Sequence, residues 1–266
     1  MDKAPRVFLV GAGPGDPELL TIKALRLLQS ANAVVYDRLV SDEIIDLIPK
    51  GVTKIYVGKR CGRHFMTQDQ INDLLVRLVQ KNHRLVRLKG GDPFMFGRGG
   101  EEAQALASHG IDFEVIPGIT SASACSTYAG IPLAHRGLSH GVQYITGHCG
   151  ANKPLDLDWK ALAAHDMTLA IYMGLANLPE IVQHLTEAGR SADTPAAIIE
   201  NGTTPSHRRI VTTLKALPEA AKNNNVCAPA MILIGEVVSL SGALDWFATT
   251  KEVSQEWYSI YRAIDK

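Results

Sequence analysis

The sequence predicts a two-domain α/β protein on the basis of three observations. In the first half, short apolar runs alternate with amphipathic helical patterns, which is typical of βαβ units around a mainly parallel sheet. A segment of small residues, Pro and Gly at 115–137 interrupts this alternation, which then resumes. The length of 266 residues suits two domains of ordinary size. We therefore expect an N-terminal domain at 1–117, a C-terminal domain at 118–247 and a charged, helical tail at 248–266.

The individual elements follow the hydrophobic periodicity. Thr67 and Gln70 have the spacing of a capping box, which predicts that a helix begins at this point. In the first domain we expect strands at 6–10, 33–37, 54–58 and 84–90, and helices at 17–30, 41–48, 67–79 and from about Gly99. In the second we expect strands at 142–146, 168–174, 195–202, 208–214 and 228–238, and helices at 158–165 and 177–189.

The composition excludes several classes of protein. Lys+Arg and Asp+Glu both number 27, so no overall positive field favours a nucleic acid or an anionic membrane, and neither partner is expected. The four cysteines (Cys61, Cys125, Cys149 and Cys227) form no Cys-x-x-Cys pair, and the first residues lack the apolar stretch of a signal peptide. No segment approaches the ~18 continuous apolar residues of a membrane helix. We therefore expect a cytoplasmic protein with free thiols.

The loop GAGPGD, at 11–16, is similar to a dinucleotide-binding fingerprint. Gly11 and Gly13 follow a strand, and Asp37 ends the next strand, where such a site has its ribose-binding carboxylate. However, Asp16 occupies the position of the third glycine, and Asp16 and Glu18 are expected in the first turn of the helix, where they repel a phosphate. The alternative interpretation is a sharp strand-to-helix turn that needs glycine for its backbone conformation.

The element RLKGGDPFMFGRGGEEA, at 87–103, is more informative. Gly90 and Gly91 end a strand and leave backbone open to a ligand, while the Asp92 carboxylate can accept hydrogen bonds from a ribose diol or an amine. The alternative is a purely structural β-to-α loop. Nine histidines are scattered, and no His/Cys/Asp/Glu set has ligand spacing, so no metal is expected.

Six motifs in order resemble a known family. They are VGAGPGDPELLT, VVYDRLVS, VGKR, RLKGGDPFMFGRGGEE, VIPGITSASACSTYAGIPLAHR and ENGTTPSHR, and they extend from Val7 to about Phe247. Together they resemble the uroporphyrinogen-III C-methyltransferase group of the tetrapyrrole methylase family. This resemblance implies a class III methyltransferase fold of two α/β domains, not a Rossmann-type fold, with the active site in the inter-domain cleft.

The resemblance also implies an activity and its partners. Methyl groups from S-adenosyl-L-methionine would be transferred to two pyrrole carbons of uroporphyrinogen III, giving precorrin-2 and S-adenosyl-L-homocysteine in a homodimeric enzyme. Precorrin-2 leads to sirohaem, cobalamin or haem d1. The cofactor residues implied by the resemblance are Pro14, Gly90, Gly91, Asp92, Met95, Thr120, Ser121, Met173, Gly202 and Ala230. The family commonly has Ile at the position of Met95 and Ala at that of Ser121.

The resemblance places the proton acceptor at Asp37 and the proton donor at Lys59, with Arg98 as a further catalytic candidate. Arg38, Lys59 and Arg60 would hold Asp37 in its charged form and make it a weak base. The alternative role of Asp37 is that of a helix-capping or salt-bridging carboxylate.

The substrate carries acetate and propionate arms, so its pocket needs cations, preferably arginines that bind carboxylates with two hydrogen bonds. The substrate-binding candidates are Arg38, Arg98, Glu101, Arg136 and His148, with Arg63 as a further cation beside a motif. Glu101 could orient an arginine or bind a pyrrole N–H. The alternatives are surface ion pairs for the charged residues and a solvated loop side chain for His148.

Three other functions remain open at this point. The same fold could serve a methylase that acts on a cobalamin intermediate, on diphthamide or on ribosomal RNA, and the last of these would be expected to show a basic surface. A nicotinamide-dependent oxidoreductase could use the GAGPGD loop, although Asp16 disfavours it. The third possibility is a binding module without catalytic activity.

Overall fold

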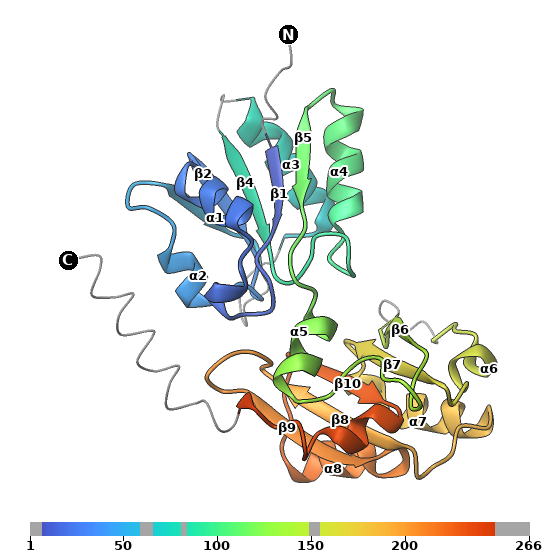
Figure 1. Ribbon diagram of the computed structural model, residues 1–266. Coiled ribbons are helices and arrows are strands. Elements are labelled where there is room, and N and C mark those ends of the chain that lie inside the picture. Colours follow the sequence, from blue (N-terminus) through green and yellow to red (C-terminus); the bar gives the residue numbers. More distant parts are fainter. Residues whose placement is uncertain (1–6, 59–65, 81–83, 149–154, 248–266) are drawn as a thin grey trace. The chain divides into compact units, whose positions relative to one another are not determined.

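The computed structural model describes residues 7–58, 66–80, 84–148 and 155–247 (Figure 1). The chain forms two compact units, Met1–Ser121 and Ala122–Lys266. This division falls a few residues after the boundary expected from the sequence. The expected tail at 248–266 lies outside the described residues.

The first unit contains a five-stranded sheet in which all four strand pairings are parallel, as predicted. The strand order is β3-β2-β4-β1-β5. The strands are β1 (Val7–Gly11), β2 (Ala33–Tyr36), β3 (Thr53–Tyr56), β4 (Leu85–Lys89) and β5 (Phe113–Ile116). The helices are α1 (Ile22–Gln29), α2 (Asp42–Asp46), α3 (Gln68–Val79) and α4 (Gly99–Ser108), with a 3₁₀ turn at Pro17–Leu19.

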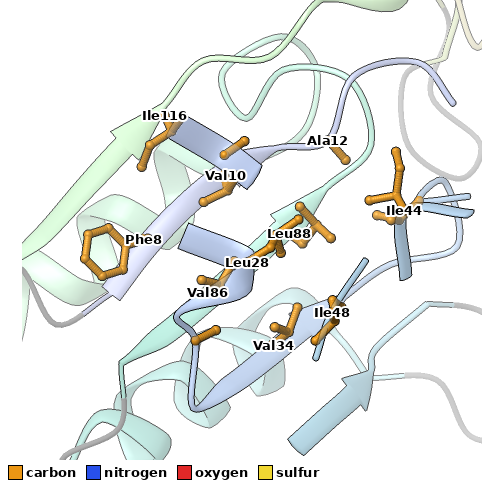
Figure 2. Close-up of a cluster of buried hydrophobic side chains, with 13 residues drawn as sticks. Phe8, Val10, Ala12, Leu28, Val34, Ile44, Ile48, Val86, Leu88 and Ile116 are labelled. Atoms are coloured by element: carbon orange, nitrogen blue, oxygen red, sulfur yellow. The ribbon is translucent and has the colours of Figure 1, made fainter. Parts of the chain in front are cut away.

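Both faces of this sheet are buried, because successive side chains of each strand point to opposite faces. Phe8 and Val10 of β1 pack with α1 and α2 on one face, where Val34, Val86 and Leu88 of the neighbouring strands join them (Figure 2). The intervening side chains of β1 pack against α3 and α4 on the other face. The sheet is therefore a rigid support for the loops that leave its edge.

Two predicted helix starts have different outcomes. The capping box of α3 is confirmed: Thr67 Oγ1 accepts a hydrogen bond from the Gln70 amide at 3.3 Å, and Gln70 Oε1 accepts one from the Thr67 amide at 2.8 Å. The prediction that Asp16 lies at the start of α1 is wrong. Asp16 caps only the 3₁₀ turn, and α1 begins at Ile22 because Thr21 Oγ1 accepts from the Ala24 amide at 3.1 Å.

The second unit contains a mixed five-stranded sheet of order β6-β7-β10-β8-β9. The β6–β7 pair is parallel, and the three remaining described pairs are antiparallel. Its strands are β6 (Gly141–Thr146), β7 (Met167–Tyr172), β8 (Pro195–Glu200), β9 (Arg208–Thr213) and β10 (Ala230–Ile234). Its helices are α5 (Ser121–Tyr128), α6 (Trp159–Leu162), α7 (Leu178–Glu187) and α8 (Leu217–Asn223). The 3₁₀ turns are Leu175–Asn177, Leu214–Ala216 and Glu236–Leu240.

Helices α6, α7 and α8 pack on one face of the second sheet, around Leu169 and Ile171 of β7. Tyr172 points to the opposite face, and its hydroxyl accepts a hydrogen bond from the Ala122 amide of α5 at 3.2 Å. The sequence did not predict α5, because it lies in the segment of small residues interpreted as a domain junction. None of the described helices is long and apolar enough to cross a membrane.

Candidate active site

In the first unit, three loops meet at the edge where β4, β1 and β5 end. Because these strands are adjacent and parallel, their carboxyl ends lie side by side, where ligands bind in open α/β sheets. The Gly13 amide donates to the Gly91 carbonyl at 3.1 Å, and the Gly91 amide donates to the Gly13 carbonyl at 2.7 Å. The Ala12 amide donates to the Lys89 carbonyl at 2.8 Å. The GAGPGD and KGGDP loops are thus joined by their backbones.

This pairing corrects the interpretation of the KGGDP glycines. The sequence suggested that Gly91 leaves its backbone open to a ligand, but its amide and its carbonyl are both bonded to Gly13. Gly90 packs against Leu39, since a Cβ at Gly90 would lie 3.0 Å from the Leu39 carbonyl oxygen. These two glycines shape the loop, and a cofactor contact at either residue stays a prediction.

The Asp92 carboxylate joins two of the loops. Oδ1 accepts from the Phe94 amide at 2.8 Å, and Oδ2 accepts from the Gly118 amide, just after β5, at 3.1 Å. An ionised carboxylate has about four lone-pair sites, so two remain for a ligand. Ser121 also faces this edge, because a Cβ at Gly91 would lie 3.5 Å from its hydroxyl oxygen.

Three other predicted cofactor residues lie on the same loops. Pro14 is half-buried in the GAGPGD loop, and Met95 and Thr120 are half-buried in the loops that follow β4 and β5. The Met95 amide donates to the Asp92 carbonyl at 3.3 Å, which continues the turn that Asp92 begins. The structure thus brings the first-unit cofactor candidates to one edge of the sheet.

Arg98 and Glu101 form an ion pair at the start of α4. Arg98 Nε donates to Glu101 Oε1 at 2.7 Å and a terminal nitrogen donates to Oε2 at 2.6 Å, so the pair has two hydrogen bonds. These bonds raise the pKa of Arg98 and lower the pKa of Glu101. Both side chains are about half exposed, and such a pair contributes little to stability. This is the surface ion pair that the sequence analysis gave as the alternative, and a role of either residue in binding the substrate stays a prediction.

The two glycines that begin α4 provide a stability prediction. A Cβ at Gly99 would lie 2.9 Å from the Pro93 carbonyl carbon and nearer still to its oxygen, whereas a Cβ at Gly100 meets no atom within 4 Å. We expect Gly99→Ala to lower the free energy of unfolding by about 2 kcal/mol through this backbone clash. Gly100→Ala should raise it by about 0.5 kcal/mol by restricting the unfolded chain. Urea unfolding of both variants measures this, and equal effects would contradict it.

Of the three cations that the sequence placed beside Asp37, the structure describes only Arg38. Arg38 is exposed, and Lys59, Arg60 and Arg63 lie outside the described residues. Instead, a terminal nitrogen of Arg87, on β4, lies 3.3 Å from Asp37 Oδ2. Asp37 Oδ1 accepts from the Leu39 amide at 3.1 Å. Asp37 is thus salt-bridged and orders its own turn, as the alternative interpretation proposed, while a quarter of its side chain stays exposed at the end of β2.

Sequence reasoning missed a cluster of buried charges beneath this edge. Glu102 of α4 is fully buried, and its Oε1 accepts from Arg87 Nε at 3.1 Å, Lys89 Nζ at 3.0 Å and Gln68 Nε2 at 3.3 Å. Burial and the neighbouring Arg87 lower the pKa of Lys89, and Glu102 opposes this shift. A detectable signal existed, because Arg and Lys occupy a strand that the alternating pattern places inside a sheet covered on both faces.

In the second unit, four candidates lie at or beside one end of the sheet. Met231 of β10 pairs with Tyr172 of β7, and Ala230 pairs with Glu200 of β8, so Met173, Gly202 and Ala230 follow or begin adjacent strands at the same end. Thr146 of β6 also pairs with Tyr172, which brings His148 to this end. Met173 has a φ of 54° and is 50% exposed, which leaves an apolar side chain at the surface. Arg136 lies in an exposed turn closed by the bridge between residues 135 and 139.

Gly202 lies against the buried thiol of Cys125 on α5. A Cβ at Gly202 would lie 3.2 Å from Cys125 Cβ and nearer still to Sγ, so only glycine fits there without movement. Asn201 and Thr203 on either side have φ values of 49° and 68°, a conformation that costs about 1–3 kcal/mol and must be held by its surroundings. Burial raises the pKa of Cys125 to about 12.

This thiol predicts a loss of stability at alkaline pH. In the unfolded chain Cys125 ionises near its ordinary pKa of 9.0, but in the folded chain only near about 12. Its contribution is therefore complete below pH 9 and falls by up to about 1.4 kcal/mol per pH unit above it. Between pH 8.5 and pH 10.5, we expect the free energy of unfolding to fall by about 2 kcal/mol more in the wild type than in Cys125→Ala. The same fall for both proteins, measured by urea unfolding at the two pH values, would contradict this.

Each edge, taken by itself, carries polar or polarizable groups of a kind that binds small molecules. In the first unit, the Asp92 carboxylate keeps acceptor sites for hydrogen-bond donors, and the Ser121 hydroxyl lies near Gly91. In the second unit, Met173 exposes a polarizable side chain of the kind that packs on flat rings. Among the described residues, no group of three or more His, Cys, Asp or Glu side chains could hold a metal ion.

Residues 6–218 match the family model described as Tetrapyrrole (Corrin/Porphyrin) Methylases. The chain belongs to the tetrapyrrole methylase family. Siroheme synthase of Azotobacter vinelandii is 54% identical over 241 residues, which cover 91% of this chain and 52% of that protein. The chain thus spans about half the length of the curated relatives that it matches.

Solved structures of this family support the same assignment. Uroporphyrin-III C-methyltransferase from Thermus thermophilus, complexed with S-adenosyl homocysteine, is 42% identical with a TM-score of 0.75, and the match covers 88% of this chain and 93% of that chain. A cobalt precorrin-4 methyltransferase is 30% identical with a TM-score of 0.77, covering 87% and 95%. The predicted tetrapyrrole methylase fold is therefore confirmed. The fold alone does not separate the two substrates, because the less identical structure matches it as well.

Proposed function

We propose that this tetrapyrrole methylase transfers methyl groups from S-adenosylmethionine to two pyrrole carbons of uroporphyrinogen III, giving precorrin-2 and S-adenosylhomocysteine. One observation carries the proposal. The Thermus enzyme, named for this substrate and complexed with the demethylated cofactor, is 42% identical over nearly its whole length, against 30% for the cobalt precorrin-4 enzyme. The name of the Azotobacter relative favours sirohaem as the use of the product.

The site chemistry fits this reaction without a metal. When bound, S-adenosylmethionine supplies an electrophilic sulfonium methyl group, so the protein has mainly to align the attacking carbon with it. The Asp92 turn and Ser121 would hold the cofactor in the first unit, and Met173, Gly202 and Ala230 would do so in the second. Asp37, partly exposed at the end of β2, would face the pyrrole ring, which carries a positive charge after methylation.

The substrate side would use charged groups. Arg98, oriented by Glu101, would bind one of the carboxylate arms, with Arg38, Arg136 and His148 as further contacts. Asp37 would accept the proton that the methylated ring loses, and Lys59, which lies outside the described residues, would be the proton donor. A homodimer, a cytoplasmic location and uroporphyrinogen III as the partner complete the proposal.

The deciding experiment is anaerobic incubation of the protein with S-adenosylmethionine and uroporphyrinogen III, followed by mass analysis of the tetrapyrrole. A gain of two methyl groups supports the proposal. No gain with this substrate, together with methylation of a cobalt precorrin, would assign the protein to another reaction of the family. Binding of NADH without affinity for S-adenosylhomocysteine would point instead to the oxidoreductase alternative.

Arg98 gives a test of the substrate side. We expect Arg98→Ala to lower kcat/KM for uroporphyrinogen III by about 10- to 100-fold, because a charge-assisted pair of hydrogen bonds to a carboxylate is lost. The dissociation constant of S-adenosylhomocysteine, measured by calorimetry, should stay within about twofold. Arg77→Ala, an exposed arginine of α3, is the matched control. Unchanged turnover in Arg98→Ala would remove Arg98 from the substrate site.

A further inference from the structure

The buried charges beneath the first-unit edge form a balanced set. Arg87 and Lys89 are each 3% exposed, and Glu102, fully buried, is the carboxylate between them. One buried carboxylate cannot balance two buried cations, and an uncompensated buried charge is strongly destabilising. The second carboxylate is that of Asp37, which lies at the surface end of the set and bonds to Arg87. Asp37, with a quarter of its side chain exposed, is therefore the most accessible member of the four.

The hydrogen bonds fix the direction in which Arg87 points. Its Nε is held by Glu102 at 3.1 Å and one terminal nitrogen donates to the Leu88 carbonyl at 2.7 Å. Because a guanidinium is planar, these two bonds set the position of the other terminal nitrogen, which meets Asp37 Oδ2 at 3.3 Å. Lys89 Nζ also donates a hydrogen bond to Glu102, at 3.0 Å, so Arg87 is not the only cation that pairs with this carboxylate. The second terminal nitrogen of Arg87 can therefore pair with Asp37.

We propose that Arg87, Lys89 and Glu102 are positioning residues, which hold the Asp37 carboxylate in one place at the end of β2 for its work on the substrate. The inference rests on the proposed function, in which Asp37 faces the methylated pyrrole. Lys89 is also the first residue of the KGGDP loop, and Glu102 is one turn from Arg98. The same cluster thus fixes the elements that carry both the cofactor loop and the substrate arginine.

The test is a double-mutant cycle on the rate of methyl transfer at saturating substrates. Arg87→Lys keeps the charge beside Glu102 but loses the planar fork, and we expect it to lower kcat about tenfold. In the Asp37→Asn background the same change should alter kcat by less than about twofold, because Arg87 acts through Asp37. KM for S-adenosylmethionine should stay within about twofold throughout. An equal loss in both backgrounds would overturn the proposal.

A second pair of variants tests whether the balance of buried charge, rather than the packing of the side chains, controls the rate of methyl transfer. Glu102→Gln leaves two buried cations with Asp37 as their only carboxylate, so we expect kcat to fall about tenfold or more. Adding Lys89→Met removes one cation and should recover at least about threefold of that loss. If the double variant is slower than Glu102→Gln, the cluster is merely structural and the proposal fails.

Two controls make the result unambiguous. The exposed pair Asp193 and Lys215 is the matched control, and the Asp193→Asn/Lys215→Met protein should keep the wild-type rate. If circular dichroism shows that Glu102→Gln does not fold, the Arg87→Lys cycle decides alone. The mass of the wild-type product reports separately on the proposed function, so a wild type without transfer is distinguished from an active wild type whose cycle shows no coupling.

Discussion

Gly118→Ala should lower the free energy of unfolding by about 3 kcal/mol or more, which is a large share of the stability of a typical domain. Gly11, Gly91 and Gly118 follow or end three adjacent strands, and their backbones touch. A Cβ at Gly118 would lie 2.8 Å from Gly11 Cα and nearer still to the Gly91 carbonyl oxygen. A Cβ at Gly11 would lie 2.5 Å from the Gly118 amide nitrogen and 2.7 Å from the Gly91 oxygen.

The effect is large because the obstructing atoms belong to the backbone of neighbouring strands. A flexible side chain could rotate away, but here a strand end itself would have to move. The substitution should therefore also separate the loops that carry Asp92 and weaken binding of S-adenosylhomocysteine. Gly242→Ala is the control, since a Cβ there meets no atom within 4 Å. Equal urea midpoints for Gly118→Ala and Gly242→Ala would show that the strand ends move at little cost in free energy, which would contradict the prediction.

Local signals predicted the first-unit elements except strand β5 and the true start of α1, because most of these elements carry their own pattern. The capping box of α3 involves residues three apart, and the strands are short apolar runs bounded by turn residues. Strand order is a different matter. The order β3-β2-β4-β1-β5 decides that the loops after Gly11, Lys89 and Ile116 meet, and no local pattern contains it. The resemblance to a family predicted the fold class, and the structure provides the strand order.

Helix α5 shows why part of the fold could not be predicted. Its sequence, SASACSTY, has no apolar stripe, because small side chains allow close packing on more than one side. Ala122, Ala124, Cys125 and Ser126 are all buried, and they do not lie on one narrow face. The pattern that reveals an amphipathic helix is therefore missing. Gly202, far along the chain, depends on this helix, since it packs against Cys125.

The charged cluster was missed for a related reason. Arg87 and Lys89 alternate with Val86 and Leu88, which taken alone suggests a strand with one polar face, although the βαβ pattern predicts that both faces of the sheet are covered. Their burial depends on Glu102, which comes from a helix that crosses the same sheet. Sequence reasoning placed Arg38, Lys59 and Arg60 beside Asp37. Among the described residues, the cation that bonds to Asp37 is Arg87 of the neighbouring strand.

Asp92→Ala should raise the dissociation constant of S-adenosylhomocysteine by at least about tenfold and lower the free energy of unfolding by about 2–3 kcal/mol. The carboxylate holds its own turn through the Phe94 amide and joins it to the β5 loop through the Gly118 amide. Removing it leaves both amides without their charged acceptor and frees the loop that begins at Gly90. Calorimetry with S-adenosylhomocysteine and urea unfolding measure the two effects, with Asp112→Ala, an exposed aspartate before β5, as the control.

Asp92→Asn separates the structural role from a direct contact. The amide keeps one oxygen acceptor, so one of the two loop bonds survives, while its NH2 group, itself a donor, faces the other backbone N–H and cannot accept its hydrogen bond. We expect about half of the stability loss of Asp92→Ala. If Asp92 also binds a ribose diol, the loss of affinity in Asp92→Asn should exceed its share of the stability loss, because neutral acceptors bind hydroxyls more weakly than carboxylates. If affinity and stability fall in the same proportion in both variants, Asp92 acts on the cofactor only through the loops that it joins.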